Sequence, residues 1–383
     1  MPRQSAVPSP VSEDITVPPD FGMRVVAWQR QHGRHDLPWQ NTRDPYRIWL
    51  SEIMLQQTQV AAVIEYFQRF VTALPDVAAL AAAPADQVMA LWAGLGYYSR
   101  ARNLHRCAKD VMEVHGGVFP TDPSVLVTLP GIGRSTAAAI AAFSAGVRSP
   151  ILDGNVKRVF ARVFGIHGYP GERAIETRMW TLAGLALPPA GPRQADDMVA
   201  YTQGLMDLGA TVCSRGKPAC LADADACPLA PDCVARRDNL TAMLPTPKPR
   251  AAIPERRTVM LIVRHGREVL VSLRPASGIW GGLWSLPELP VETLPFDAEA
   301  AEDAALEAAR PFGQPTRAYL AGELTHVFTH FRLLIRAIRV DLEAATPCAG
   351  GETRWLSLDD LDALGTPAPV RRLLEDQARS GLF

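Results

Sequence analysis

The spacing of apolar residues divides the chain into a helical part and a mixed part. From Phe21 to Arg237, apolar residues recur every three or four positions, and glycine or proline ends each periodic run. This spacing is typical of amphipathic helices, and no run in this part alternates as a strand would. We therefore predict an all-α domain over residues 21–238, preceded by a disordered tail over residues 1–20.

A proline-rich stretch separates this helical part from a region with a different period. Residues 239–256 contain Pro-Thr-Pro-Lys-Pro-Arg and are typical of a semi-rigid linker. After the linker, the mostly apolar runs at residues 258–263 and 269–273 flank a His-Gly turn and predict a β-hairpin. The later elements that we expect are a helix over 297–310, two strands over 318–340 and a helix over 369–379. Residues 257–383 are therefore predicted to form a small α/β domain.

Composition adds limits to this picture. The chain has 383 residues, 48% of them hydrophobic, which is enough for a sizeable core and two or three domains. The formal net charge of −1 means that any DNA affinity must come from local basic patches. No apolar run is typical of a signal peptide or a membrane span, so we expect a cytoplasmic protein without a membrane partner.

One glutamate lies in an unusual place on a predicted helix. Asp44 can cap this helix and Pro45 suits its first turn. Glu52 has apolar neighbours such as Ile48 and Leu55 at helical spacing, and burial there would raise its pKa, as a general acid requires. The alternative is a glutamate that reaches solvent or an arginine, and the helix alone favours that alternative.

Four residues after Glu52, a run of polar side chains interrupts the apolar face of the helix. Gln56, Gln57 and Thr58 carry amides and a hydroxyl that can bind base edges or phosphates, although Thr58 could instead cap a following helix over 59–74. The whole stretch W-L-S-E-I-M-L-Q-Q-T-Q-V resembles the MutY family of adenine DNA glycosylases, in the helix-hairpin-helix glycosylase superfamily. The resemblance implies that Glu52 is the acid that protonates the adenine leaving group.

The same resemblance implies further roles in binding DNA. It places Trp39 and Gln203 beside the base pocket, whereas Trp39 alone could equally fill the core. The turn Gly-Leu-Gly-Tyr-Tyr at residues 94–98 can present a ring next to the arginines that follow it. The residues alone equally allow a corner between two helices in which Tyr97 is buried. The resemblance implies instead that Tyr97 enters the duplex, with Gln57 as a second wedge.

A glycine hairpin and an aspartate loop follow. Leu-Pro-Gly-Ile-Gly, with Gly131 and Gly133, is a weak signal alone, but it matches the helix-hairpin-helix signature that grips the DNA backbone. Asp153 could simply cap the next helix. Its spacing from the hairpin matches the superfamily's essential aspartate, which stabilises or captures the sugar cation. Asn155 would then orient Asp153 or the water, and the environments of Asp153 and Glu52 would push their pKa values apart.

Ser135 bears on strand cutting. Relatives that cut the strand have a lysine at this position, which forms a Schiff base with the sugar, and serine cannot do so. We therefore predict a monofunctional enzyme. Lys157 is a candidate DNA contact that could trap an aldehyde product adventitiously.

Four of the six cysteines are clustered, which suits a metal site in a reducing compartment better than disulfides. They are Cys213, Cys220, Cys227 and Cys233. The family pattern C-x6-C-x2-C-x5-C holds a [4Fe–4S] cluster, and this chain has four extra residues between the second and third cysteines. We expect an exposed loop to absorb them. Zinc is the alternative, and either centre would position DNA without breaking bonds.

The C-terminal domain has its own motif. Trp-Gly-Gly-Leu-Trp-Ser-Leu-Pro at residues 280–287 resembles Nudix-like domains, but residues 302–310 lack the metal-binding acids of a working Nudix hydrolase. The resemblance implies a recognition domain in which Phe328, Thr329 and His330 read 8-oxoguanine. The alternative for the histidines of this turn is a solvated strand end, which the residues alone favour.

Together these features predict a monomeric adenine DNA glycosylase that acts on double-stranded DNA with adenine opposite 8-oxoguanine or guanine. A bifunctional glycosylase/lyase for oxidised bases is the main alternative. A lesion-binding protein or a nucleotide pyrophosphohydrolase would leave Glu52 and Asp153 without a role.

Overall fold

The computed structural model describes residues 16–249, 253–289, 298–328, 330–348 and 351–379. These residues group into two compact units. The first comprises residues 1–71, 76–78 and 107–250, and the second comprises residues 72–75, 79–106 and 251–383. Residues 79–106, which their periodicity places in the helical domain, thus group with the C-terminal residues. Most of the predicted tail lies outside the described residues.

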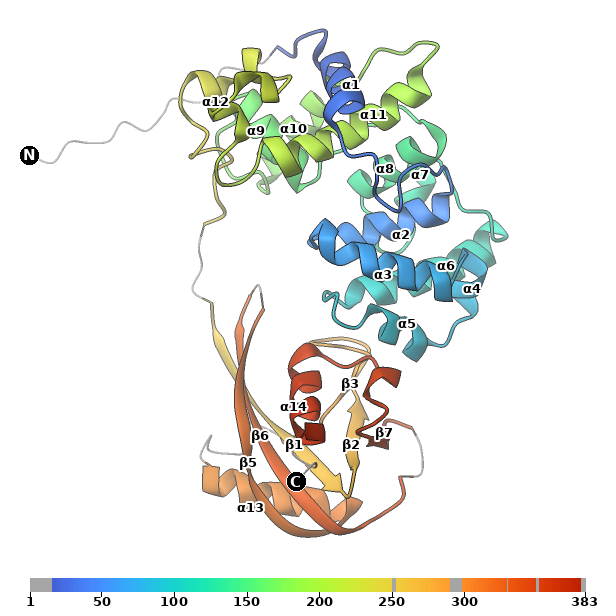
Figure 1. The fold of residues 1–383 in the computed structure, drawn as a ribbon, viewed down its shortest axis with the longest axis vertical. Coiled ribbons are helices and arrows are strands. Elements are labelled where there is room, and N and C mark those ends of the chain that lie inside the picture. Colours follow the sequence, from blue (N-terminus) through green and yellow to red (C-terminus); the bar gives the residue numbers. More distant parts are fainter. Residues whose placement is uncertain (1–15, 250–252, 290–297, 329, 349–350, 380–383) are drawn as a thin grey trace, which may run out of the picture. The chain divides into compact units, whose positions relative to one another are not determined.

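In the described chain before residue 255, the regular secondary structure consists of helices only. They are α1 (Phe21–His32), α2 (Pro45–Leu55), α3 (Val60–Ala73), α4 (Val77–Ala82), α5 (Ala85–Trp92), α6 (Ser99–His115), α7 (Pro123–Leu126), α8 (Arg134–Ala145), α9 (Gly154–Val163), α10 (Arg173–Leu185), α11 (Gln194–Asp207) and α12 (Val234–Arg237), with the short turns η1 (Leu208–Val212), η2 (Ala219–Leu221), η3 (Ala224–Ala226) and η4 (Ala230–Asp232). The all-α prediction for this part is therefore confirmed (Figure 1).

The core of the first unit lies between α1, α9 and α11. Phe21, Phe160 and Phe164 are buried, and their ring centroids lie 5.3–5.9 Å apart. Helices α1 and α11 approach closely at Gly204, where a Cβ atom would lie 2.8 Å from Cγ1 of Val25. This contact fixes α11 against the segment that leads into α2.

Helix α2 begins as its sequence predicts. The Asp44 carboxylate accepts a hydrogen bond from the backbone N–H of Tyr46, and Pro45 occupies the first turn. The helix ends at Leu55, and Gln57 then adopts a positive φ of 58°. The polar run after Glu52 therefore forms a turn at the end of the helix.

The second unit contains a mixed sheet in the order β3-β2-β1-β6-β5, with β4 paired to β1 and β7 paired to β2. Its strands are β1 (Glu255–His265), β2 (Glu268–Leu273), β3 (Trp284–Ser285), β4 (Glu288–Leu289), β5 (Gly313–Val327), β6 (Arg332–Ala345) and β7 (Thr353–Ser357). β1 and β2 form the predicted hairpin, and β1 runs parallel to β6. The two predicted strands over 318–340 exist but are longer at both ends.

Two helices of this unit also match the prediction. α13 (Ala298–Ala309) packs against β1, β4, β5 and β6 through the buried alanines Ala301 and Ala305. α14 (Ala368–Arg379) is the last described element. The α/β prediction for the C-terminal domain is therefore confirmed. In the described part of the chain, no helix is both long and apolar enough to cross a membrane.

The close approach at Gly204 predicts opposite effects for two glycine-to-alanine changes. Gly204→Ala places a methyl group against Val25 and Gln29, so we expect it to destabilise the protein by about 1–3 kcal/mol. Gly184→Ala, in α10, meets nothing within 4 Å, and we expect it to stabilise the protein by about 0.5–1 kcal/mol. Urea unfolding followed by the helical circular dichroism signal measures both. Equal shifts of the same sign would contradict the packing at α1 and α11.

Candidate active site

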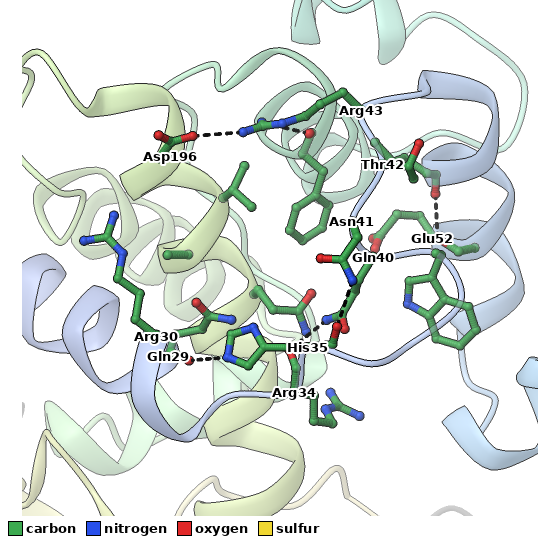
Figure 2. A pocket seen from close by; sticks show the side chains of 17 residues that line it. Gln29, Arg30, Arg34, His35, Gln40, Asn41, Thr42, Arg43, Glu52 and Asp196 are labelled. Atoms are coloured by element: carbon green, nitrogen blue, oxygen red, sulfur yellow. Dashed lines mark hydrogen bonds and ion pairs between the residues drawn. The ribbon is translucent and has the colours of Figure 1, made fainter.

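A cavity of about 400 Å³ lies in the first unit beside Glu52. Its walls come from the end of α1, the loop that follows it, α2 and α11 (Figure 2). Glu52, Trp39 and Gln203, which the sequence placed at one pocket, all line it. The remaining lining residues are Gln29, Arg30, Arg34, His35, Gln40, Asn41, Thr42, Arg43, Ile48, Ser51, Phe143, Asp196, Val199 and Ala200.

The loop between α1 and α2 is held on α11 by a buried aspartate. Asp207 accepts hydrogen bonds from the backbone N–H of Arg34 at 2.9 Å and from its Nε at 2.7 Å. The same carboxylate accepts from Nε2 of Gln203 at 2.9 Å. The Gln203 side chain is therefore oriented by its amide nitrogen, which leaves its carbonyl oxygen as the group for a ligand.

Trp39 is buried in the core and also lines the cavity. The side chain is buried, and its ring packs edge-on against Phe67 at a centroid distance of 5.5 Å. It also forms part of the cavity wall. A large aromatic surface therefore faces whatever occupies the cavity.

Glu52 is half-buried in α2, and its carboxylate forms no hydrogen bond or ion pair with another described residue. Burial, and then the charge of Asp153, raise its pKa from an ordinary value of 4.5 to about 8. The carboxyl group is therefore protonated near neutral pH, and no protein partner holds that proton.

Asp153 lies directly before α9 and has different partners. Its carboxylate accepts a hydrogen bond from the N–H of Val156 at 2.7 Å, so it does cap the helix, as the simpler interpretation expected. Burial raises its pKa too, but N–H groups of Val156 and Asn155 and the positive charge of Arg158 oppose that effect. Burial thus acts on both carboxyl groups, and only Asp153 has partners that favour the anion.

Asn155 is held by an arginine that the sequence reasoning missed. Arg158 is buried, and it donates to Oδ1 of Asn155 at 2.7 Å and to the carbonyl oxygen of Cys213 at 2.7 Å. Arg158 therefore links the Asp153 loop to the cysteine segment. Its place three residues after Asn155, on the same helix face, was the available signal.

Ser135 and Lys157 are both engaged close to Asp153. The Ser135 hydroxyl accepts from the N–H of Leu152 at 2.9 Å, which ties the loop before Asp153 to α8. The Lys157 amine forms a 2.6 Å ion pair with Glu176. Neither position offers a free amine to a sugar.

In the hairpin before α8, the backbone is not covered by side chains. Gly131 has a φ of 80°, and Gly133 is the N-cap of α8 without a side-chain cap. A Cβ atom at Gly133 would meet nothing within 4 Å. The first N–H groups of α8 can therefore accept an anion. Nearby, Nε2 of Gln56 lies 3.4 Å from Oγ1 of Thr136.

Tyr97, in the second unit, is not a buried corner residue. Its side chain is 44% exposed, its φ is 47°, and the Arg100 guanidinium lies 5.4 Å from its ring centroid. An exposed ring held in an uncommon backbone conformation is available to an external partner.

The turn between β5 and β6 carries an aromatic cluster, which we define as Trp280, His326, Phe328, His330 and Phe331. Phe328 stacks on Phe331 at 4.5 Å and lies 4.6 Å from His326. His326 is thus packed against a ring instead of solvated, and burial lowers its pKa. His330 is exposed but its ring lies 4.8 Å from Phe331. Thr329 lies outside the described residues.

The four clustered cysteines line one small cavity in the first unit. Among the described residues, no three metal-ligating side chains surround a single ion. A lone zinc needs its thiolates about 2.3 Å from one centre, whereas an iron–sulfur cluster spreads them over several irons. Four cysteines around one cavity can supply thiolates to either kind of centre. The four extra residues fall within the segment 221–226, of which residues 221–225 are exposed, in and between the turns η2 and η3.

The raised pKa of Glu52 predicts a pH-dependent penalty on stability. Between pH 4.5 and about 8 the folded protein binds the Glu52 proton more tightly than the unfolded chain, so stability falls as pH rises through this window. Glu52→Gln removes the charge, and we expect it to be about 2–4 kcal/mol more stable than wild type above pH 8 and equal to it near pH 4. Chemical unfolding at a series of pH values measures this difference. Glu65→Gln, at an exposed position of α3, is the control, and an equal gain there would contradict the burial of Glu52.

Comparison with known proteins agrees with this geometry. Residues 50–184 match the HhH-GPD superfamily of base excision DNA repair proteins, and residues 258–376 match the NUDIX domain. The chain is 32% identical to the adenine DNA glycosylase of Buchnera aphidicola subsp. Schizaphis graminum, over 93% of this chain and 98% of that protein. It is 32% identical to the adenine DNA glycosylase of Rattus norvegicus, over 94% of this chain and 79% of that protein. This chain therefore belongs to the adenine DNA glycosylase family.

Proposed function

We propose that this protein removes adenine mispaired with 8-oxoguanine, or with guanine, by hydrolysing the N-glycosidic bond without cutting the strand. The observation that carries the proposal is Glu52, which holds a proton near neutral pH without a hydrogen-bond partner among the described residues, beside a cavity of about 400 Å³. Such a cavity is large enough for a purine base.

The adenine must leave the base stack, because its N7 and glycosidic bond are inaccessible inside the duplex. In the cavity, Trp39 supplies an aromatic wall, and the Gln203 carbonyl oxygen can accept from the exocyclic amine of adenine. Glu52 then donates its proton to N7. This turns the base into a neutral leaving group, which departs with the electron pair of the C–N bond.

Departure of the base leaves positive charge on the sugar. Asp153, which caps α9 beside Arg158, is the anion that would stabilise or capture this charge. Water then adds to the sugar and releases a proton. Asn155, oriented by Arg158, would position Asp153 or this water. Ser135 cannot form a Schiff base, and the Lys157 amine is paired with Glu176, which supports base removal without a lyase step.

Contacts to DNA follow from the exposed elements. We propose that Gln57 and Tyr97 enter the duplex and that Gly131 and Gly133 present backbone N–H groups to a phosphate. Gln56 and Thr58 would lie against the strand that carries the adenine. In the second unit, Phe328, Thr329 and His330 would read 8-oxoguanine through the turn between β5 and β6.

We also propose that the four cysteines hold a [4Fe–4S] cluster, whose role when bound is structural. Arg162 donates to Sγ of Cys213 at 3.3 Å, and Arg158 donates to its carbonyl oxygen. The cysteine segment is thereby fixed to the helix that Asp153 caps. Loss of its shape would therefore reach the active site through Arg158.

The direct test of the function uses a duplex with one adenine opposite 8-oxoguanine. We expect cleavage on a denaturing gel only after alkali treatment, and we expect Glu52→Gln to lose at least about 100-fold in rate while still binding DNA. Cleavage without alkali would instead support the bifunctional alternative. Full activity of Glu52→Gln would refute the acid assignment.

Metal analysis tests the cofactor. Purified under anaerobic conditions, the protein should contain about four irons per chain with matching sulfide and a broad visible absorption band. Cys227→Ser should lose iron and stability, whereas Cys348→Ser, outside the cluster segment, should keep both. One zinc per chain and no visible absorption would favour the zinc alternative.

A further inference from the structure

One arginine of the second unit joins two segments that are far apart in the sequence. The guanidinium of Arg102, in the first turn of α6, donates a hydrogen bond to the carbonyl oxygen of Gly281, 179 residues away. Arg102 is half-buried, and burial lowers its pKa. The bond therefore lies in a partly water-excluded place, where it is stronger than on an open surface.

The carbonyl oxygen of Gly281, which accepts this hydrogen bond, belongs to a tightly packed turn. Trp280 has a φ of 54° and Gly282 a φ of 72°. A Cβ atom at Gly281 would lie 2.7 Å from the carbonyl oxygen of Ala276, so the turn packs without spare room. The N–H of Gly282 donates to the carbonyl oxygen of Arg274 at 3.2 Å. The carbonyl group that Arg102 binds therefore has a fixed direction.

The residue before Gly281 contacts the aromatic cluster at the turn between β5 and β6. The Trp280 ring lies 5.5 Å from His326 and 5.5 Å from Phe328. The two contacts thus use consecutive residues of one rigid turn. A displacement of Phe328 would be transmitted through Trp280 to the carbonyl group that holds Arg102.

The other end of the connection is the Tyr97 turn. The N–H of Arg102 donates to the carbonyl oxygen of Tyr98 at 3.2 Å, and the N–H of Arg100 donates to that of Tyr97 at 2.9 Å. The Arg100 guanidinium also donates to the carbonyl oxygens of Leu95 and Gly96. The turn and the start of α6 therefore form one hydrogen-bonded body, and Arg102 anchors it.

We propose that Arg102 is a positioning residue that couples recognition of the base opposite adenine to insertion of Tyr97 into the duplex. The inference rests on the proposed roles of Tyr97 and Phe328. With 8-oxoguanine at the aromatic cluster, the Trp280–Gly282 turn holds Arg102, and Tyr97 is held in its inserted position. With guanine this support is weaker. Arg102 thus contributes to the preference between the two substrates.

The test compares Arg102→Met with Arg106→Met. Both changes remove one positive charge from α6, but Arg106 is exposed and bonds only to Asn103 among the described residues. Single-turnover rates of adenine removal are measured opposite 8-oxoguanine and opposite guanine. We expect Arg102→Met to reduce the ratio of the two rates by about 5- to 10-fold, mainly by slowing the 8-oxoguanine substrate, and Arg106→Met to leave the ratio unchanged.

A second readout reports on Tyr97 itself. A fluorescent 2-aminopurine placed beside the lesion brightens when its stack is opened, and Arg102→Met should reduce this signal for the 8-oxoguanine duplex only. Arg102→Lys, which keeps a donor and the charge, should restore part of both effects. Unchanged signals, or equal losses on both substrates, would overturn the proposal.

Contiguous contacts do not prove coupling, so a double-mutant cycle with Trp280→Leu completes the test. If the two residues act along one connection, the double variant should change the substrate ratio by less than the product of the single effects. Multiplicative effects would contradict the connection. Failure of wild type to release adenine from either duplex would instead refute the proposed function, so the two failures are distinguishable.

Discussion

The first unit depends on one constraint, a protonated carboxyl group that has no hydrogen-bond partner in the part of the chain that the structure describes. Glu52 lies in a helix whose buried residues, apart from Ser51, are hydrophobic, and its pKa of about 8 lowers stability at neutral pH. A destabilising group of this kind persists only where many contacts fix the structure around it. Here the cap at Asp44, the α1–α2 loop bound to Asp207 and the packing at Gly204 provide that structure.

The same constraint explains why Asp153 must differ from Glu52. When two carboxyl groups lie in a buried site close enough to interact, ionising both costs free energy because the two negative charges repel each other. Asp153 has helix N–H groups and Arg158 as partners, whereas Glu52 has none among the described residues. Burial raises the pKa of both groups, and among the described residues only the partners of Asp153 oppose that shift. Aspartate and glutamate differ by only one methylene group. The contrast between the two carboxyl groups therefore comes from their surroundings and not from their residue types.

Much of this arrangement could be predicted from sequence because it depends on local signals. Helix periods, the cap at Asp44 and the hairpin at residue 265 each need only neighbours along the chain. The place of Glu52 on an apolar flank was equally local. The link from Arg158 to Cys213 and the bond from Arg102 to Gly281 were not predictable, because each joins segments that only the folded chain brings together.

Local reasoning also could not choose between two compatible roles. Asp153 is both a helix cap and a charged neighbour of Glu52, and Trp39 both fills the core and lines the cavity. In each case the contact that stabilises the fold also holds the side chain in the position that the proposed chemistry needs. Gln57 and Tyr97 show the reverse relation, since positive φ values are unfavourable for residues with side chains. The proposed insertion of both exposed side chains into the duplex would offset that cost.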